Sequence, residues 1–106
     1  MIDNLFKMPD DLPDDEVFES IIQDKGILIE RIISTGQSSP AGLWYEQDRD
    51  EWVAVLQGEA GVWMQGDVTH LKTGDWLLIP AGEKHRVEYT SSQPSCIWLA
   101  VHGKLI

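Results

Sequence analysis

An acid and an imidazole, each at the head of an apolar run, are the residues best placed to do chemistry in this sequence. Glu51 is followed at alternate positions by Val53 and Val55, and His85 is followed by Val87. Alternate residues of a strand face the same side, so valines that point into a core bring the acid and the imidazole with them. A buried polar group is costly unless it is paired or ligated. The two side chains therefore predict an interior site, either a metal site or a hydrogen-bond network.

The elements that must position this site are short apolar runs, separated by turn residues at intervals of roughly 8–12, as in all-β sandwiches and barrels. Every break contains residues that satisfy turn dihedral angles, such as Gly, Pro, Asp or Ser. No stretch repeats apolar residues at helical spacing for three turns. We therefore expect an all-β single domain with its best tight hairpin at residues 65–67. The predicted strands are 18–23, 27–34, 41–47, 52–57, 61–65, 67–71, 75–79, 85–89 and 95–102.

Length and charge limit the partners. The chain has 106 residues with 18 acidic and 8 basic side chains, a formal charge of −10, and this length corresponds to one domain. Binding to nucleic acid phosphates is driven by Lys and Arg, and the chain has no basic run, so we expect no nucleic acid partner. No apolar run approaches the roughly 20 residues that span a bilayer, and the N-terminus has no basic start with an apolar core. We expect a cytoplasmic protein with no membrane partner.

The acids are concentrated at the N-terminus. Seven of them and one Lys lie in the first 20 residues, which carry −6, while the rest of the chain carries −4. We expect residues 1–16 to form an irregular, solvated acidic segment and residues 17–106 to form the domain. Cys96 stands alone, so the sequence predicts no intrachain disulfide and no thiol-rich metal site.

The stretch 74–89 carries a recognisable motif. Gly74, Pro80, Gly82 and His85 are spaced as in G(X)5PXG(X)2H(X)3N, with Tyr89 in place of the final Asn. This stretch resembles the second motif of the cupin superfamily. The glycines suit turns and the proline suits a strand end.

The first cupin motif, G(X)5HXH(X)3,4E(X)6G, is eroded. Glu51 and Gly58 reproduce its E(X)6G part, and counting back puts Tyr45 and Gln47 where the motif has its two histidines. The leading Gly falls at Ser39. The resemblance extends over about residues 27–102 and implies a cupin-like double-stranded β-barrel, or jelly roll, of two antiparallel sheets.

Cupins commonly bind one divalent metal ion inside the barrel. The resemblance therefore implies Mn, Fe, Zn or Ni held by His85 and Glu51, with Gln47 and Tyr45 completing the site; imidazole and carboxylate suit these ions. In the alternative, the same four side chains form a metal-free network that lines a pocket.

Further side chains are predicted near this pocket from strand alternation. Tyr89 lies four residues after His85, and His102 shares a strand face with Trp98; both are expected to line the pocket. Glu30 and Arg31 interrupt an apolar run, where a salt bridge at the strand edge is favoured over a pocket contact.

Two runs, residues 27–33 and 97–101, are apolar on both faces. A second copy of the chain would cover such strands, so we expect a homodimer. The predicted function is to bind, and in one version to transform, a small polar molecule in the pocket. The alternatives are a metal-free binding or sensor module and a dimerising scaffold without catalysis. No catalytic residue is assigned, because the fold alone does not determine function.

Overall fold

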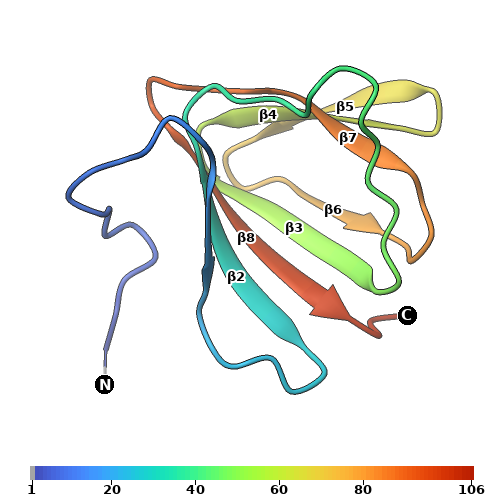
Figure 1. Ribbon diagram of the computed structural model, residues 1–106, viewed down its shortest axis with the longest axis horizontal. Helices are drawn as coiled ribbons and strands as arrows, with labels where there is room; N and C mark the ends of the chain where they lie inside the picture. Colours follow the sequence, from blue (N-terminus) through green and yellow to red (C-terminus); the bar gives the residue numbers. More distant parts are fainter. Residues whose placement is uncertain (1) are drawn as a thin grey trace.

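Two antiparallel β-sheets face each other in this protein and close into a barrel (Figure 1). The structure is a computed structural model that describes residues 2–106. In this range the chain forms no helix, so none crosses a membrane. The first sheet has the strand order β1-β2-β8-β3-β6 and the second has the order β5-β4-β7. The strands are β1 (Val17–Ser20), β2 (Leu28–Ser34), β3 (Asp50–Gln57), β4 (Glu59–Met64), β5 (Asp67–Lys72), β6 (Trp76–Ile79), β7 (His85–Thr90) and β8 (Cys96–Gly103).

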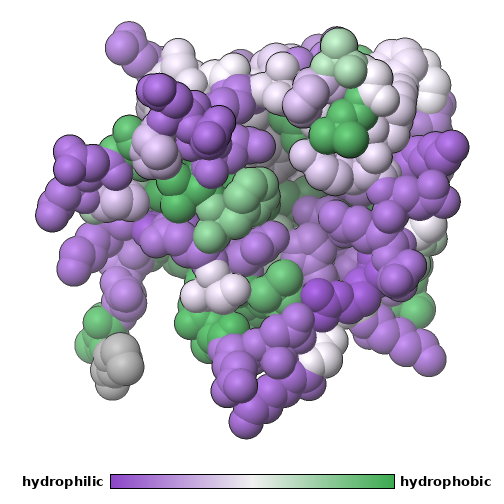
Figure 2. All heavy atoms as spheres, in the orientation of Figure 1, coloured by the Kyte–Doolittle hydropathy of each residue, from purple (hydrophilic) through white to green (hydrophobic). Residues whose placement is uncertain are grey.

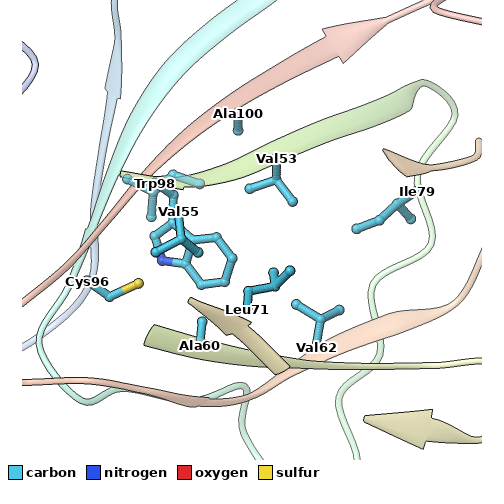
Figure 3. Packing of buried hydrophobic residues seen from close by; sticks show 10 residues of the cluster. Val53, Val55, Ala60, Val62, Leu71, Ile79, Cys96, Trp98 and Ala100 are labelled. Carbon is cyan, nitrogen blue, oxygen red and sulfur yellow. The ribbon is translucent and has the colours of Figure 1, made fainter. Parts of the chain in front are cut away.

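The core lies between the sheets and consists of the alternate, inward-facing residues of the strands (Figure 3). Val53 and Val55 enter it from β3, and Trp98 and Ala100 enter it from β8, all at 3% exposure or less. The predicted inward face of both strands is thereby confirmed. The complete buried cluster is Ile32, Val53, Val55, Ala60, Val62, Leu71, Ile79, Cys96, Trp98 and Ala100.

Turn chemistry also follows the sequence. Gln65 and Gly66, with φ angles of 56° and 81°, form the two-residue connection between β4 and β5, as type I′ hairpins require. Gly82, with φ of 81°, reverses the chain between β6 and β7. Next to this reversal the Asp50 carboxylate accepts the amide of Ala81, which ties the start of β3 to the turn that precedes His85.

The predicted strand at residues 41–47 is wrong. Those residues form a turn, closed by the Leu43 amide on the Pro40 carbonyl, and one isolated bridge at Tyr45. Proline has no amide to donate to a ladder, and Gly42 takes a φ of 79°, so the segment cannot pair continuously. The chain from Ser39 to Tyr45 still runs along the free edge of β7, because the Ser39 amide bonds the Val87 carbonyl and the Tyr45 amide bonds the His85 carbonyl.

Tyr89 does not share the inward face with His85, contrary to the expectation from alternation. The register between β4 and β7 shifts, because Val62 pairs with Val87 whereas Gly61 pairs with Tyr89. Glu88 is the extra residue of this β-bulge, and a bulge reverses the side on which later residues lie. Tyr89 therefore lies over Gly61 on the outer face, where its hydroxyl bonds His70 Nδ1 at 2.8 Å.

The N-terminal segment lies against the outer face of β2. Residues 2–16 contain no strand, and Met1, the first residue of the predicted segment 1–16, lies outside the described residues. Arg31 donates to the carbonyls of Leu5 and Lys7 and forms a salt bridge with Glu19 at 2.6 Å. On the face of the molecule that Figure 2 shows, most side chains are hydrophilic and the hydrophobic ones form separate patches.

Candidate functional site

A cavity of about 110 Å³ opens between the two sheets. All four residues predicted as metal ligands line it, namely Tyr45, Gln47, Glu51 and His85. His102, which was predicted to line the pocket, does so as well. Tyr89 is not part of its wall. The residues that line it are Glu16, Phe18, Glu30, Ile32, Tyr45, Gln47, Glu51, Val53, Val62, Ile79, His85, Val87, Trp98 and His102.

Backbone bonds fix one wall of the cavity. Tyr45 and His85 exchange both amide–carbonyl bonds, at 2.8 and 3.0 Å, and the Gly82 amide bonds the Gln47 carbonyl at 2.8 Å. The segment before β3 is thus held to the start of β7, which places the ring of Tyr45 5.9 Å from the ring of His85. Residues 45 and 47 therefore lie close to residue 85, although neither of them is part of a continuous strand.

Glu51 lies between two imidazoles. Its Oε1 is 3.6 Å from His85 Nε2, and its Oε2 is 3.9 Å from His102 Nε2. The β3–β8 pairing brings Glu51 opposite His102, while His85 approaches from the other sheet. All three residues are 6–8% exposed, so the group is buried in the end of the barrel.

The ring of His85 has a fixed tautomer when it is neutral. Its Nδ1 is 3.0 Å from the Glu83 carbonyl, and a carbonyl only accepts, so Nδ1 carries the proton and Nε2 presents a lone pair. That lone pair faces the Glu51 carboxylate. Burial by itself lowers the pKa of His85, but the Glu51 carboxylate and the Glu83 carbonyl outweigh burial and raise the pKa above its usual value.

His102 has a carboxylate partner of its own. Its Nε2 lies 3.0 Å from Glu30 Oε1 and donates to it. The Glu30 carboxylate raises the pKa of His102, burial opposes this, and Glu51 adds to the increase. The Nε2 proton of His102 therefore points toward Glu30 and not toward Glu51.

Two acidic residues of the cavity wall, Glu30 and Glu16, were not predicted to lie there. Glu30 was expected to form a salt bridge at the strand edge, but Arg31 makes that bridge with Glu19 and Glu30 faces inward, two positions from the buried Ile32. The alternation of β2 was the signal that could have found it. Glu16 was expected to lie in the solvated acidic segment, but it borders the cavity and its carboxylate accepts the hydroxyl of Ser34.

A divalent metal ion fits this donor set only in part. His85 Nε2 and Glu51 Oε1 have the lone pairs and the separation of two ligands, and the Glu83 carbonyl orients the imidazole as in many metal sites. No group of three or more His, Cys, Asp or Glu side chains within residues 2–106 is arranged to hold a metal, and His102 is turned to Glu30. Structural and catalytic sites usually have at least three protein ligands, so these residues fall short of a metal site.

His70 and Cys96 do not line the cavity. His70 is exposed on β5, beside Tyr89. Cys96 is fully buried in the core, and burial raises the pKa of its thiol to about 12. A thiol that stays protonated is not a nucleophile.

Similarity to known proteins agrees with this architecture. The family profile described as "Cupin domain" matches residues 31–102. The structure of "a putative mannose-6-phosphate isomerase" from Ralstonia eutropha JMP134 is 44% identical, covers 98% of each chain and superposes with a TM-score of 0.88. A cupin superfamily protein from Desulfitobacterium hafniense DCB-2 is 18% identical, covers 91% of this chain and 84% of that one, and has a TM-score of 0.76.

One curated protein, an uncharacterized protein of Aquifex aeolicus (strain VF5), is 36% identical over 47 residues. That alignment spans 44% of this chain and 39% of the other protein. The profile match covers more than half of the chain and includes β3, β7 and β8, the three strands that carry Glu51, His85 and His102. The chain belongs to the cupin family.

Proposed function

We propose that the cavity binds a small polar molecule without a resident metal ion, and that a hydrogen-bond donor of this molecule lies between His85 and Glu51. One observation carries the proposal. His85 Nε2 and Glu51 Oε1 are 3.6 Å apart, which is too long for a hydrogen bond, and both present lone pairs when the imidazole is neutral. Two acceptors that face each other in a mostly buried cavity are stabilised by a donor between them.

Size and charge restrict the molecule. A mannose 6-phosphate-like ligand, which the name of the Ralstonia protein suggests, carries a dianionic phosphate that Arg and Lys usually hold. None of the side chains that line the cavity within residues 2–106 is Lys or Arg. The cavity of about 110 Å³ is also smaller than the roughly 300 Å³ at which drug-sized pockets begin. A compact ligand is therefore favoured over a sugar phosphate.

Glycerol is a suitable probe, because it is compact and carries three hydroxyl donors. We expect glycerol to shift the imidazole ¹⁵N resonances of His85 and His102 in a saturable manner, while the exposed His70 stays unchanged and serves as the internal control. The variant His85→Ala should lose the response, and the matched variant His70→Ala should keep it. If glycerol shifts all three imidazoles in parallel and without saturation, the proposed binding site does not exist.

A divalent metal ion at His85 and Glu51 is the second candidate. The hydrogen bond from His85 Nδ1 to the Glu83 carbonyl favours it, because this contact leaves Nε2 free to coordinate. Elemental analysis of protein purified without an affinity tag separates the candidates. Stoichiometric Mn, Fe, Zn or Ni that is lost in His85→Ala would support the metal, whereas its absence from fully folded protein would support the metal-free site.

We also infer that the protein is a homodimer that associates through the outer face of its first sheet. Ile33 and Ile97, which motivated a dimer from the sequence, are 1% exposed within the single chain, so they need no partner. An exposed apolar patch lies at the opposite edge of the sheet, where Trp52 and Trp76 have ring centroids 6.1 Å apart and Trp76 is 60% exposed. Two-fold association commonly covers such a patch.

Light scattering tests the dimer. The parent chain should have twice the monomer mass, and Trp76→Asp should have the monomer mass. The matched variant Trp44→Asp changes a partly exposed Trp that packs with Trp63 on the second sheet, and it should leave the dimer intact. A parent chain with monomer mass at tens of micromolar would remove the inference.

A further inference from the structure

We propose that the ligand of this cavity is a small cation, a primary ammonium that also carries hydroxyl groups, and that the cavity rejects carboxylates and phosphates. The inference rests on the proposed binding function and adds the charge class of the ligand. It depends on three features of the cavity: the excess of carboxylates, the missing hydrogen bonds of Glu51 and the small volume.

Carboxylates outnumber cationic groups in the wall. Glu16, Glu30 and Glu51 line the cavity, and the only lining groups within residues 2–106 that can become positive are the imidazoles of His85 and His102. Even with both imidazoles protonated, the wall carries one negative charge in excess, and with both neutral it carries three. Charges in a partly enclosed cavity interact more strongly than charges in bulk water, so an anionic ligand is disfavoured in either state.

Glu51 makes no side-chain hydrogen bond within the described residues, and its carboxylate oxygens keep some exposed surface in the cavity. It is 8% exposed, and its contacts within the described chain are the two imidazole nitrogens at 3.6 and 3.9 Å. Neither distance is a hydrogen bond. A carboxylate has about four acceptor sites, and an ammonium has three donors and no acceptor. An ammonium between Glu51 and His85 Nε2 would satisfy both groups at once and offset the buried negative charge.

The other two acids have partners that leave room for such a ligand. Glu30 accepts from His102 Nε2 at 3.0 Å, and Glu16 accepts from the Ser34 hydroxyl. Both carboxylates still border the cavity and can accept hydroxyl donors. Benzene, with six non-hydrogen atoms, occupies a dry cavity of 150 Å³, so a cavity of about 110 Å³ encloses roughly four to five such atoms, and the rest of a slightly larger ligand lies at its mouth.

Three probes with the same three-carbon skeleton separate the charge classes: glycerol, 2-amino-1,3-propanediol as the cation and glycerate as the anion. Binding is followed at neutral pH and constant ionic strength by the imidazole resonances of His85 and His102. We expect the amino diol to bind about tenfold or more tightly than glycerol and glycerate to bind more weakly than glycerol. Equal affinities, or a preference for glycerate, would overturn the inference while leaving the proposed function intact. Failure of all three probes to bind would instead refute the proposed function.

Charge variants test the cause. Glu30→Gln keeps an oxygen acceptor for His102 and for a ligand hydroxyl but removes one negative charge, so it should weaken binding of the amino diol severalfold more than binding of glycerol. The matched variant Glu59→Gln removes the same charge from an exposed site outside the cavity, and it should change neither affinity. A preference for the amino diol that falls equally in Glu30→Gln and Glu59→Gln would mean that the overall charge of −10, not the cavity, attracts the cation, and would overturn the inference.

Discussion

Replacing Gly61 with alanine tests the bulge that turns Tyr89 out of the barrel. Gly61 has an ordinary strand conformation, so the backbone tolerates a side chain there. A Cβ at this position would lie 2.3 Å from Tyr89 Cε1, 2.7 Å from Tyr89 Cδ1 and 3.1 Å from Val68 Cγ1. The tyrosine ring must therefore move, and its hydrogen bond to His70 at 2.8 Å is lost or weakened.

The magnitude follows from two opposing effects. Forcing an extra methyl group into a well-packed site costs about 1–3 kcal/mol, while replacing a strand glycine with alanine returns about 0.5–1 kcal/mol of backbone entropy. We expect Gly61→Ala to lower the free energy of unfolding by about 1–2 kcal/mol. A domain of this size then loses roughly 5–15 °C in Tm.

A double-mutant cycle with Tyr89→Ala separates the clash from other effects of the alanine. Denaturant unfolding of the parent, both single variants and the double variant gives the four free energies. Because removing the ring removes the clash, and the entropy gain of the alanine cancels in the cycle, Tyr89→Ala should cost about 1–3 kcal/mol less in the Gly61→Ala background than in the parent. If the two changes add, or if Gly61→Ala is as stable as the parent, Tyr89 does not lie over Gly61 and the bulge is misplaced.

Two further predictions concern the buried polar groups. The Trp98 indole N–H donates to the Ser34 hydroxyl at 3.1 Å, and Ser34→Ala removes this acceptor. We expect the free energy of unfolding, measured with denaturant, to fall by about 1–3 kcal/mol. The control Ser38→Ala, at an exposed position, should stay within about 0.5 kcal/mol of the parent. Glu30 raises the pKa of His102, so the stabilisation from this pair is complete below the unfolded pKa of about 6.5 and disappears as the pH rises through the higher folded value. Calorimetry should therefore give a Tm that falls as the pH rises above about 6.5, and Glu30→Gln should flatten this slope. An equal slope in both proteins would exclude the pair as its cause.

The sequence by itself determined the class of fold and the inward placement of the central acid and imidazole. The turn residues at regular intervals and the alternation of Glu51 with Val53 and Val55 specify strands with one buried face, which is a local property of each segment. The spacing from Gly74 to His85 specifies a strand, a reversal and a second strand, and the observed β6, Gly82 and β7 follow it.

The tertiary structure decided what no local pattern contains. Residues 41–47 run along the free edge of β7 but pair with it only at Tyr45, and the face of Tyr89 depends on one extra residue relative to β4. Glu30 faces His102 because β2 and β8 pair antiparallel in one particular register. Alternation predicts which residues share a face within a strand, but a bulge or a pairing register is a relation between strands. Only the packed sheets fix that relation, and with it the set of carboxylates and imidazoles that meet in the cavity.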